Sequence, residues 1–292
     1  MTAYRRRRLT GLLYLAPALI FVLVFTAYPF VQAVAMSFTN WSLITPPKPV
    51  GLGNFQAILA DKQFWTSLGY TIRYTVIITP ILMVGGYLLA LLVAPNSGLR
   101  RTTRAIVFIP VVIGLGVSSL AWVWLFDPTF GLINRFLMDL GLIEKPIRFL
   151  GVDADLSTWS IIASVVWKVI GFGTILFVAA IQAIPSEVNE ATMVDGATFW
   201  QRTRRVTLPL TRRTILLVTL ISVIGSLLAF DQFYIMTAGQ PFNQTATAVY
   251  FIYLNSFPYL HLGYGAALSL ILAAIILVFT VVQMLLTRRS EI

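Results

Sequence analysis

Residues 185–197 read PSEVNEATMVDGA and form the longest polar interruption on the arginine-rich side of a hydrophobic chain. Ser186 can cap a helix whose first turn carries Glu187 and Glu190, where the positive end of the helix dipole favours acids. Gly196 should end that helix, because glycine readily adopts backbone angles that a helix cannot continue. The pattern therefore predicts a short helix in a loop between two apolar runs.

A second short helix is predicted directly after the glycine. Thr198 and Gln201 stand at the spacing of a capping box. Pro209 should end this helix before a basic cluster and the next apolar run. Two short helices joined at a glycine make a compact unit, and we expect the loop that carries them to cover residues 184–213.

Residues at fixed spacing along this loop resemble a known signature. They are Glu190, Ala191, Gly196, Val206, Leu208 and Pro209. They resemble the EAA motif of the membrane subunits of ABC importers, with Thr192 in place of the second alanine and Val206 in place of isoleucine. An amphipathic cytoplasmic loop of another kind would also hold acids, arginines and a glycine, but the motif fixes several residue types over twenty positions. The resemblance implies a loop that docks into ATPase subunits through Glu187, Glu190, Ala191, Asp195, Gly196, Leu208 and Pro209.

The composition indicates a membrane protein. Of the 292 residues, 58% are hydrophobic and 11% are charged, whereas a soluble domain carries roughly 25% charged residues. The chain has no cysteine and one histidine, His261, so thiolate metal sites, disulfides and histidine clusters are not expected. It also lacks a Gly-Lys pair and hence the phosphate-binding P-loop. If ATP drives this protein, another chain must hydrolyse it.

Six apolar runs are long enough to cross a bilayer, which needs about 20 residues. We predict an all-α polytopic membrane protein, one permease domain over residues 1–292, with spans at about 12–34, 70–93, 105–126, 158–183, 214–237 and 263–286. The first run follows Arg5–Arg8 and is similar to a secretory signal, but it is longer than the roughly 7–15 apolar residues of such a signal. We expect a retained first span with a cytoplasmic N-terminus.

The distribution of basic residues agrees with this topology. Loops on one side hold 14 of the 21 basic residues, namely Arg5–Arg8, Arg100, Arg101, Arg104, Arg202, Arg204, Arg205, Arg212, Arg213, Arg288 and Arg289. By the positive-inside rule this side is the cytoplasm, and both termini lie there. The net charge of +10 thus reflects topology, and we expect membrane lipid and no nucleic acid as a partner. The predicted location is the inner membrane of a bacterial or archaeal cell.

Beyond the loop, segments along residues 53–287 resemble the sugar-type permeases of these importers. They include Gly53-Asn54-Phe55, Gly131-Leu132-Ile133-Asn134, Trp167-Lys168, Phe230-Asp231 and Gly263-Tyr264-Gly265. The resemblance implies the type I ABC importer permease fold with six transmembrane helices. It also implies a second homologous permease subunit, an extracellular solute-binding protein and two ATPase subunits that bind ATP and magnesium, so this chain itself needs no cofactor or metal. Members of the family carry sugars, oligosaccharides or glycerol-3-phosphate.

Two ionisable residues fall inside predicted spans, Lys168 near mid-depth and Asp231 in the outer part of the fifth span. Such residues cost roughly 2.5–3.5 kcal/mol on insertion scales and usually face a cavity or a partner. They can line the solute path, they can pair with each other, or Lys168 can extend towards the outer interface. Gly171 and Gly173 are interpreted as sites of close helix packing. The candidate solute path comprises Lys168, Phe172, Phe230, Asp231, Gln232 and Tyr234.

The sequence thus favours a permease subunit of an ATP-driven importer that translocates a sugar or sugar-like solute and performs no bond chemistry itself. The alternative is an ion-coupled secondary transporter that uses Lys168 and Asp231, but such a carrier needs no loop that docks an ATPase. A membrane-embedded enzyme would need catalytic groups clustered at one interface, and here they are scattered. The identity of the solute stays open.

Overall fold

The computed structural model describes residues 14–42, 44–95 and 97–288. Helices dominate these residues, and the only β-pairing within them is an isolated bridge between Thr39 and Pro49. The prediction of an all-α protein is confirmed. Arg5–Arg8, the first two residues of the expected first span and Arg289 lie outside the described residues.

Several helices have the length and composition to cross a membrane. Four do so singly: Tyr14–Ser37, α4 (Lys62–Val93), α8 (Ala154–Gln182) and Leu262–Leu285 within α15 (Leu262–Arg288). Two bent pairs pass the same test: α5 (Gly98–Val112) with α6 (Leu115–Leu125), and Phe199–Leu210 with α12 (Arg212–Leu227). The described chain therefore has four spans, or up to six if each bent pair is one span, which is compatible with the six that the sequence predicts.

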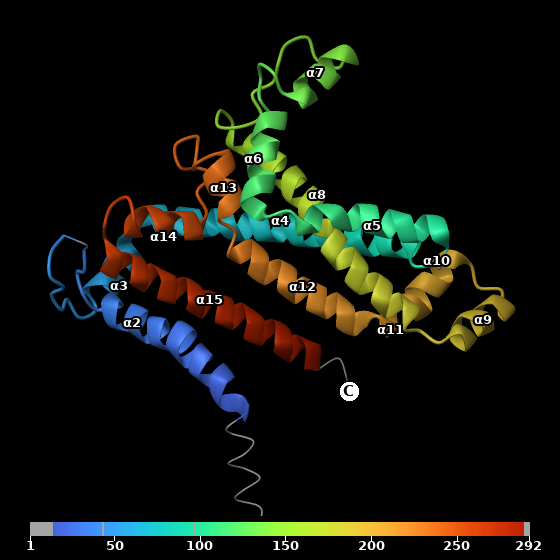
Figure 1. Cartoon of the computed structure of the whole chain (residues 1–292), viewed down its shortest axis with the longest axis horizontal. Helices are drawn as coiled ribbons and strands as arrows, with labels where there is room; N and C mark the ends of the chain where they lie inside the picture. Colours follow the sequence, from blue (N-terminus) through green and yellow to red (C-terminus); the bar gives the residue numbers. More distant parts are fainter. Residues whose placement is uncertain (1–13, 43, 96, 289–292) are drawn as a thin grey trace, which may run out of the picture. The chain divides into compact units, whose positions relative to one another are not determined.

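The chain forms two compact units (Figure 1). The first unit falls within residues 1–62 and 252–275, and the second within residues 63–251 and 276–292. The helices α14 (Ala248–Ser256) and α15 each begin in one unit and end in the other. The single permease domain expected over the whole chain stays a prediction.

The first unit is organised around the end of its first helix. This helix, Tyr14–Ser37, includes the π-helical η1 (Leu23–Ala27) and α2 (Tyr28–Ser37), and α3 (Gly53–Ala60) follows it. Asn54 donates through Nδ2 to the carbonyl oxygens of Ser37 and Thr39, each at 2.8 Å. These carbonyls follow the end of α2, where the helix itself supplies no partner. The asparagine of the Gly-Asn-Phe segment is thus a cap for the first span.

The start of α15 is fixed in the same unit. The amide of Gly263 donates to the carbonyl of Trp41 at 3.0 Å, and a Cβ on Gly263 would overlap the carbonyl of Thr39. The hydroxyl of Tyr264 donates to Oδ2 of Asp61 at 2.6 Å. The glycine of the Gly-Tyr-Gly segment is therefore required by the close approach of two backbones.

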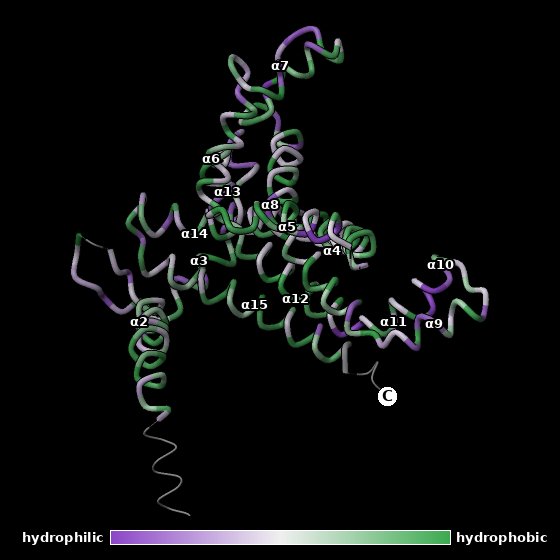
Figure 2. The backbone as a smooth tube through the Cα atoms, turned by 45° about the vertical axis from the view of Figure 1, so that its right-hand side comes forward, coloured by the Kyte–Doolittle hydropathy of each residue, from purple (hydrophilic) through white to green (hydrophobic). Residues whose placement is uncertain are grey.

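In the second unit, α8 lies at the centre and packs against α5, α6, α12 and α13 (Asp231–Met236). Its core is apolar and aromatic, and Tyr74, Ile161 and Phe233 are almost fully buried. Figure 1 shows α7 (Leu132–Asp139) beyond one end of α8, while α9 and α10 lie near the other end. Figure 2 shows apolar colouring along α12 and more polar colouring around α9 and α10. Spans joined by a loop outside the bilayer have this pattern.

Glycines allow the central helix to approach its neighbours closely. A Cβ on Gly171 would overlap the carbonyl oxygen of Val107 in α5. A Cβ on Gly86 in α4 would lie 3.5 Å from the backbone nitrogen of Thr174 in α8. The interpretation of Gly171 as a packing residue is confirmed, because small residues let membrane helices pack at the level of their backbones.

The third span differs from the prediction of one continuous helix over residues 105–126. α5 and α6 meet at an angle of 97°. Between them, Ile113 and Gly114 are extended, with ψ of 134° and 144°. Pro110 lies in the last turn of α5 and offers no N–H to the helix. The break therefore coincides with a proline, three β-branched residues and a glycine, and the prediction of a continuous span did not take this local sequence into account.

The fifth span also differs from the prediction of a helix over residues 214–237. α12 ends at Leu227, and α13 begins at Asp231 after a residue with φ of −135°. The buried hydroxyl of Thr247 donates to the carbonyl of Ala229 within this break, at 2.8 Å. A polar side chain from another segment thus supplies the partner that the interrupted helix has lost, as buried backbone groups in a membrane require.

The segment between α6 and α8 depends on Asn134. This side chain is 1% exposed and makes three hydrogen bonds, to the carbonyls of Asp127 and Ile147 and from the amide of Ile147. We expect Asn134→Leu to leave these backbone groups unpaired, at about 1–3 kcal/mol for each buried group. Limited proteolysis within residues 127–153 should become much faster than in the wild type. An unchanged digestion rate would contradict this role for Asn134.

Candidate functional site

The first helix of the predicted loop is α9 (Ser186–Val194). The prediction that Ser186 caps it is wrong, because Pro185 occupies the N-cap position and Ser186 is already helical. The extended ψ of Pro185, 143°, starts the helix one residue earlier than expected. Glu187 lies in the first turn, as predicted, whereas Glu190 lies beyond it.

A tight turn at Gly196 ends α9. The amide of Gly196 donates to the carbonyl of Met193 at 3.1 Å, and the amide of Ala197 donates to that of Thr192 at 3.0 Å. These two bonds form the Schellman motif, whose left-handed residue is usually glycine. Gly196 has φ of +68°. The predicted break at this glycine is confirmed.

The second helix begins with the predicted capping box. The amide of Thr198 donates to Oε1 of Gln201 at 2.8 Å, and the amide of Gln201 donates to Oγ1 of Thr198 at 3.4 Å. The helix then continues as α10 (Phe199–Arg202), η2 (Thr203–Thr207) and α11 (Leu208–Leu210). The expected start of this helix is therefore confirmed.

The prediction that Pro209 ends the second helix is wrong. The amide of Leu208 donates to the carbonyl of Thr203, five residues back, and the π-turn so formed leads into Pro209. A proline cannot donate to the carbonyl four residues back and would collide with it, so the wider turn accommodates the ring. The π-helix η1 precedes Pro29 in the same way. The chain bends by 72° after Leu210 and enters α12.

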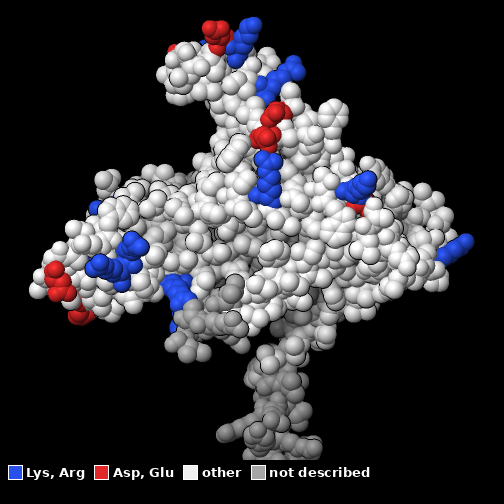
Figure 3. Space-filling model, turned by 180° about the vertical axis from the view of Figure 1, so that it is seen from behind, with Lys and Arg blue, Asp and Glu red and all other residues white. Residues whose placement is uncertain are grey.

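The surface of the loop carries the residues that the motif singled out. All seven predicted docking residues are exposed: Glu187, Glu190, Ala191, Asp195, Gly196, Leu208 and Pro209. Val194 is 88% exposed and Trp200 is 64% exposed. Figure 3 shows charged side chains gathered at the end of the second unit that carries α9 and α10, and more around α7. The loop thus offers a mixed apolar and charged surface on two short helices joined at Gly196.

A cavity of about 180 Å³ lies between α4, α6, α8, α12 and α13. Its walls are mainly apolar, and its polar side chains are Tyr74, Ser222, Ser226 and Gln232. The side chains of Gln232 and Tyr74 hydrogen-bond to each other. An apolar wall with a few hydroxyl and amide groups is typical of sites that bind small molecules.

The structure brings two of the six candidate solute-path residues to this cavity, Phe172 and Gln232. The rings of Phe230 and Tyr234 stack on each other, with centroids 5.4 Å apart and planes at 8°. Asp231 is exposed in the first turn of α13. Phe230, Asp231, Tyr234 and Lys168 do not line the cavity, so their place on the path stays a prediction.

Lys168 is only 7% exposed, and its amine donates to the carbonyl oxygen of Val111 at 3.3 Å. Among the described residues, the ion pair that forms is Arg73 with Asp155, and none joins Lys168 to Asp231. The alternative that these two residues pair with each other is therefore wrong for this conformation. The partner of the lysine is a backbone carbonyl, which no sequence pattern marks.

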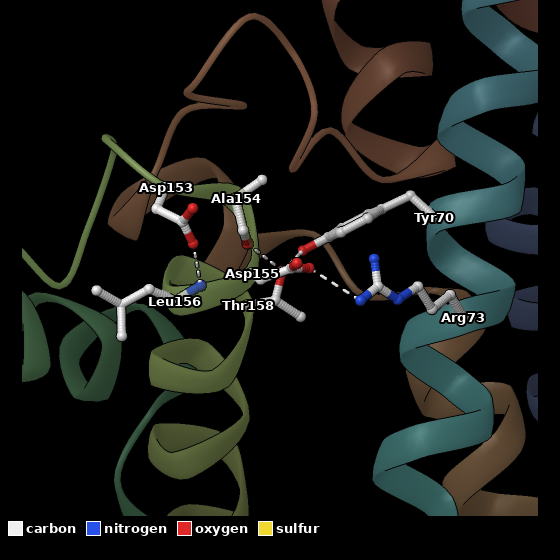
Figure 4. A network of polar contacts seen from close by, with 7 residues as sticks. All are labelled: Tyr70, Arg73, Asp153, Ala154, Asp155, Leu156 and Thr158. Atoms are coloured by element: carbon white, nitrogen blue, oxygen red, sulfur yellow. Dashed lines mark hydrogen bonds and ion pairs between the residues drawn. The ribbon is translucent and has the colours of Figure 1, made fainter.

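Figure 4 shows a polar network between α4 and the start of α8 that sequence reasoning missed. Arg73 pairs with Asp155 at 2.9 Å, and the hydroxyls of Tyr70 and Thr158 lie 2.8 Å apart. A charged arginine three residues inside the predicted second span is the signal that could have indicated a partner. The network links the part of α4 at which the predicted second span begins to the start of α8.

The long apolar helices and the exposed loop between two of them are compatible with a membrane-spanning protein. Residues 86–292 match the family of binding-protein-dependent transport system inner membrane components. This match covers more than half of the chain, and the chain belongs to that family. It is therefore a multi-pass permease subunit of an ABC importer.

Relatives in this family align over nearly the whole chain. One is the trehalose/maltose transport system permease protein MalF of Thermococcus litoralis, 32% identical over 96% of this chain and 94% of the relative. Another is the probable starch degradation products transport system permease protein AmyD of Thermoanaerobacterium thermosulfurigenes, 30% identical over 96% of this chain and 94% of the relative.

A solved structure shares the fold along the full length. It is a chain of a bacterial alginate ABC transporter in complex with an alginate pentasaccharide-bound periplasmic protein, with 25% identity and a TM-score of 0.87. The match covers 99% of this chain and 98% of the other. The type I ABC importer permease fold that the sequence predicts is therefore confirmed.

Proposed function

We propose that this chain carries a sugar or sugar-like solute across the membrane, driven by ATP that separate subunits hydrolyse. The pair of short, exposed helices within residues 184–213 carries the proposal, since their apolar and charged surface suits docking of another protein. Relatives that are named for trehalose, maltose and starch products support the class of solute. The cavity with Tyr74, Phe172 and Gln232 is compatible with it.

The proposed complex contains a second homologous permease subunit, two ATPase subunits that hold ATP and magnesium, and an extracellular solute-binding protein. A partner of the last kind agrees with the family of this chain. Both termini and the loop of residues 184–213 lie in the cytoplasm of a bacterial or archaeal cell. The chain itself uses no cofactor and catalyses no reaction.

Photo-crosslinking tests the docking surface directly. A crosslinking amino acid at Val194, which is 88% exposed on the loop, should capture an ATPase subunit in the assembled complex. The same group at Leu142, which is 67% exposed between α7 and α8, should not. Capture of the ATPase from Leu142, or its absence at Val194 in an active complex, would contradict the proposal.

The orientation can be checked with single cysteines, because the chain has none of its own. We expect Gly98→Cys to be protected from a membrane-impermeant maleimide in intact cells, and Lys145→Cys to react. The reason is the excess of arginine on the side of the first position. Cells opened with detergent serve as the control, in which both should react. Labelling of the first position from outside would overturn the topology.

A further inference from the structure

The break in the third span leaves a helix end inside the membrane. An uninterrupted helix would pair the carbonyl of Val111 with the amide of Leu115. Here α5 ends at Val112, and Ile113 and Gly114 are extended. Ile113 donates to the carbonyl of Pro110 at 3.2 Å, so one carbonyl of the last turn is satisfied locally. The carbonyl of Val111 needs a partner from elsewhere, because water is absent from the bilayer core.

Lys168 supplies that partner from the middle of α8. Its amine lies 3.3 Å from the carbonyl oxygen of Val111, and the residue is buried. The side chain can reach this carbonyl because Gly171, one turn further along α8, lets α5 come into backbone contact at Val107. A positive group is also favoured at this place, since the C-terminal end of a helix carries partial negative charge.

The capped helix end is next to the wall of the cavity. Leu115, the first residue of α6, lines the cavity, as do Val165, Val169 and Phe172 of α8. Lys168 itself is not part of the lining. The angle between α5 and α6 therefore determines where Leu115 stands relative to the lining residues of α8.

We propose that Lys168 is a positioning residue that caps the broken end of α5 and thereby fixes the bend between α5 and α6. The bend holds Leu115 in the wall of the cavity. This role goes beyond the proposed function, because it requires neither contact with the solute nor an acidic partner. This role explains why a lysine lies in the centre of a span and hydrogen-bonds to a backbone carbonyl.

The chain lacks cysteine, so the bend can be measured with two spin labels in the assembled complex and without solute. Suitable sites are Ile106 in α5 and Leu120 in α6, which are 60% and 49% exposed. With the natural Lys168, we expect one narrow distribution of the distance between the two spin labels. Lys168→Met keeps most of the length of the side chain but removes the donor, and it should shift or broaden the distribution. Lys168→Arg keeps a donor and should restore the narrow distribution.

A matched control is Thr174→Val, also in α8. Thr174 is buried, but its hydroxyl donates to the carbonyl of Ile170 within its own helix, at 2.8 Å. Thr174→Val should therefore leave the distribution of spin-label distances unchanged. An unchanged distribution in Lys168→Met would overturn the proposal, and so would equal broadening in Thr174→Val or failure of Lys168→Arg to restore it. If Lys168→Met does not assemble, the comparison of Lys168→Arg with wild type decides, and a broadened distribution there overturns the proposal.

Discussion

Gly196→Val should nearly abolish the ATP hydrolysis that the loaded binding protein stimulates, while the permease still inserts into the membrane. Gly196 has φ of +68°, a conformation that is strained for a β-branched residue and costs roughly 1–2 kcal/mol even for ordinary residues. Valine would release the turn between α9 and α10 and displace the two helices relative to each other. Stimulated hydrolysis by the purified complex measures the effect.

Gly196→Asn is the informative companion, because asparagine tolerates the left-handed conformation. A Cβ at this position meets no atom within 4 Å in this chain, so any obstruction must come from a docked partner. Recovery of stimulated hydrolysis in Gly196→Asn would mean that the turn alone matters. Loss in both variants would mean that the partner approaches the glycine itself. Normal hydrolysis in Gly196→Val would refute the loop as the coupling element.

Gly171→Ala should destabilise the permease strongly, although it adds one methyl group. That methyl would overlap the carbonyl oxygen of Val107, and an atom of the backbone cannot move aside as a flexible side chain can. Forced expansion of a packed core typically costs about 1–3 kcal/mol, and occasionally more. We expect a clearly lower melting temperature of the detergent-solubilised complex and a changed angle between α5 and α6.

Gly69→Ala is the matched control for this change. Gly69 lies within α4, and a Cβ there meets nothing within 4 Å. The substitution should be neutral or stabilise the helix by up to about 1 kcal/mol, since alanine favours helices over glycine. Equal melting temperatures for the two variants would contradict the close approach of α5 and α8.

The sequence predicts the elements that depend on local pattern. The long apolar runs predict the spans, and the capping box at Thr198 and the break at Gly196 follow from residue type alone. The start of α9 and the end of the second helix were harder to predict. Pro185 and Pro209 each constrain the backbone in a way that depends on the turn around them, and sequence spacing does not reveal whether a π-turn forms.

The features missed by sequence reasoning depend on tertiary contacts. The breaks after Val112 and Leu227 persist because Lys168 and Thr247, from other segments, satisfy freed carbonyls. A lone lysine in an apolar run predicts a cavity, a partner or an approach to the interface, but the sequence does not reveal that the partner is a backbone carbonyl. Of the candidate solute path, Phe172 and Gln232 line one cavity and the other candidates do not, because which side chains reach a cavity depends on how the helices pack.

Uptake into sealed vesicles tests the central claim most directly. The vesicles would contain the purified complex with ATP inside and the binding protein outside, loaded with the solute that co-purifies with it and is identified by mass spectrometry. We expect uptake to require both ATP and the loaded binding protein. We also expect it to persist when ionophores collapse the proton and sodium gradients. Uptake that follows an ion gradient and continues without ATP would contradict it and favour an ion-coupled carrier.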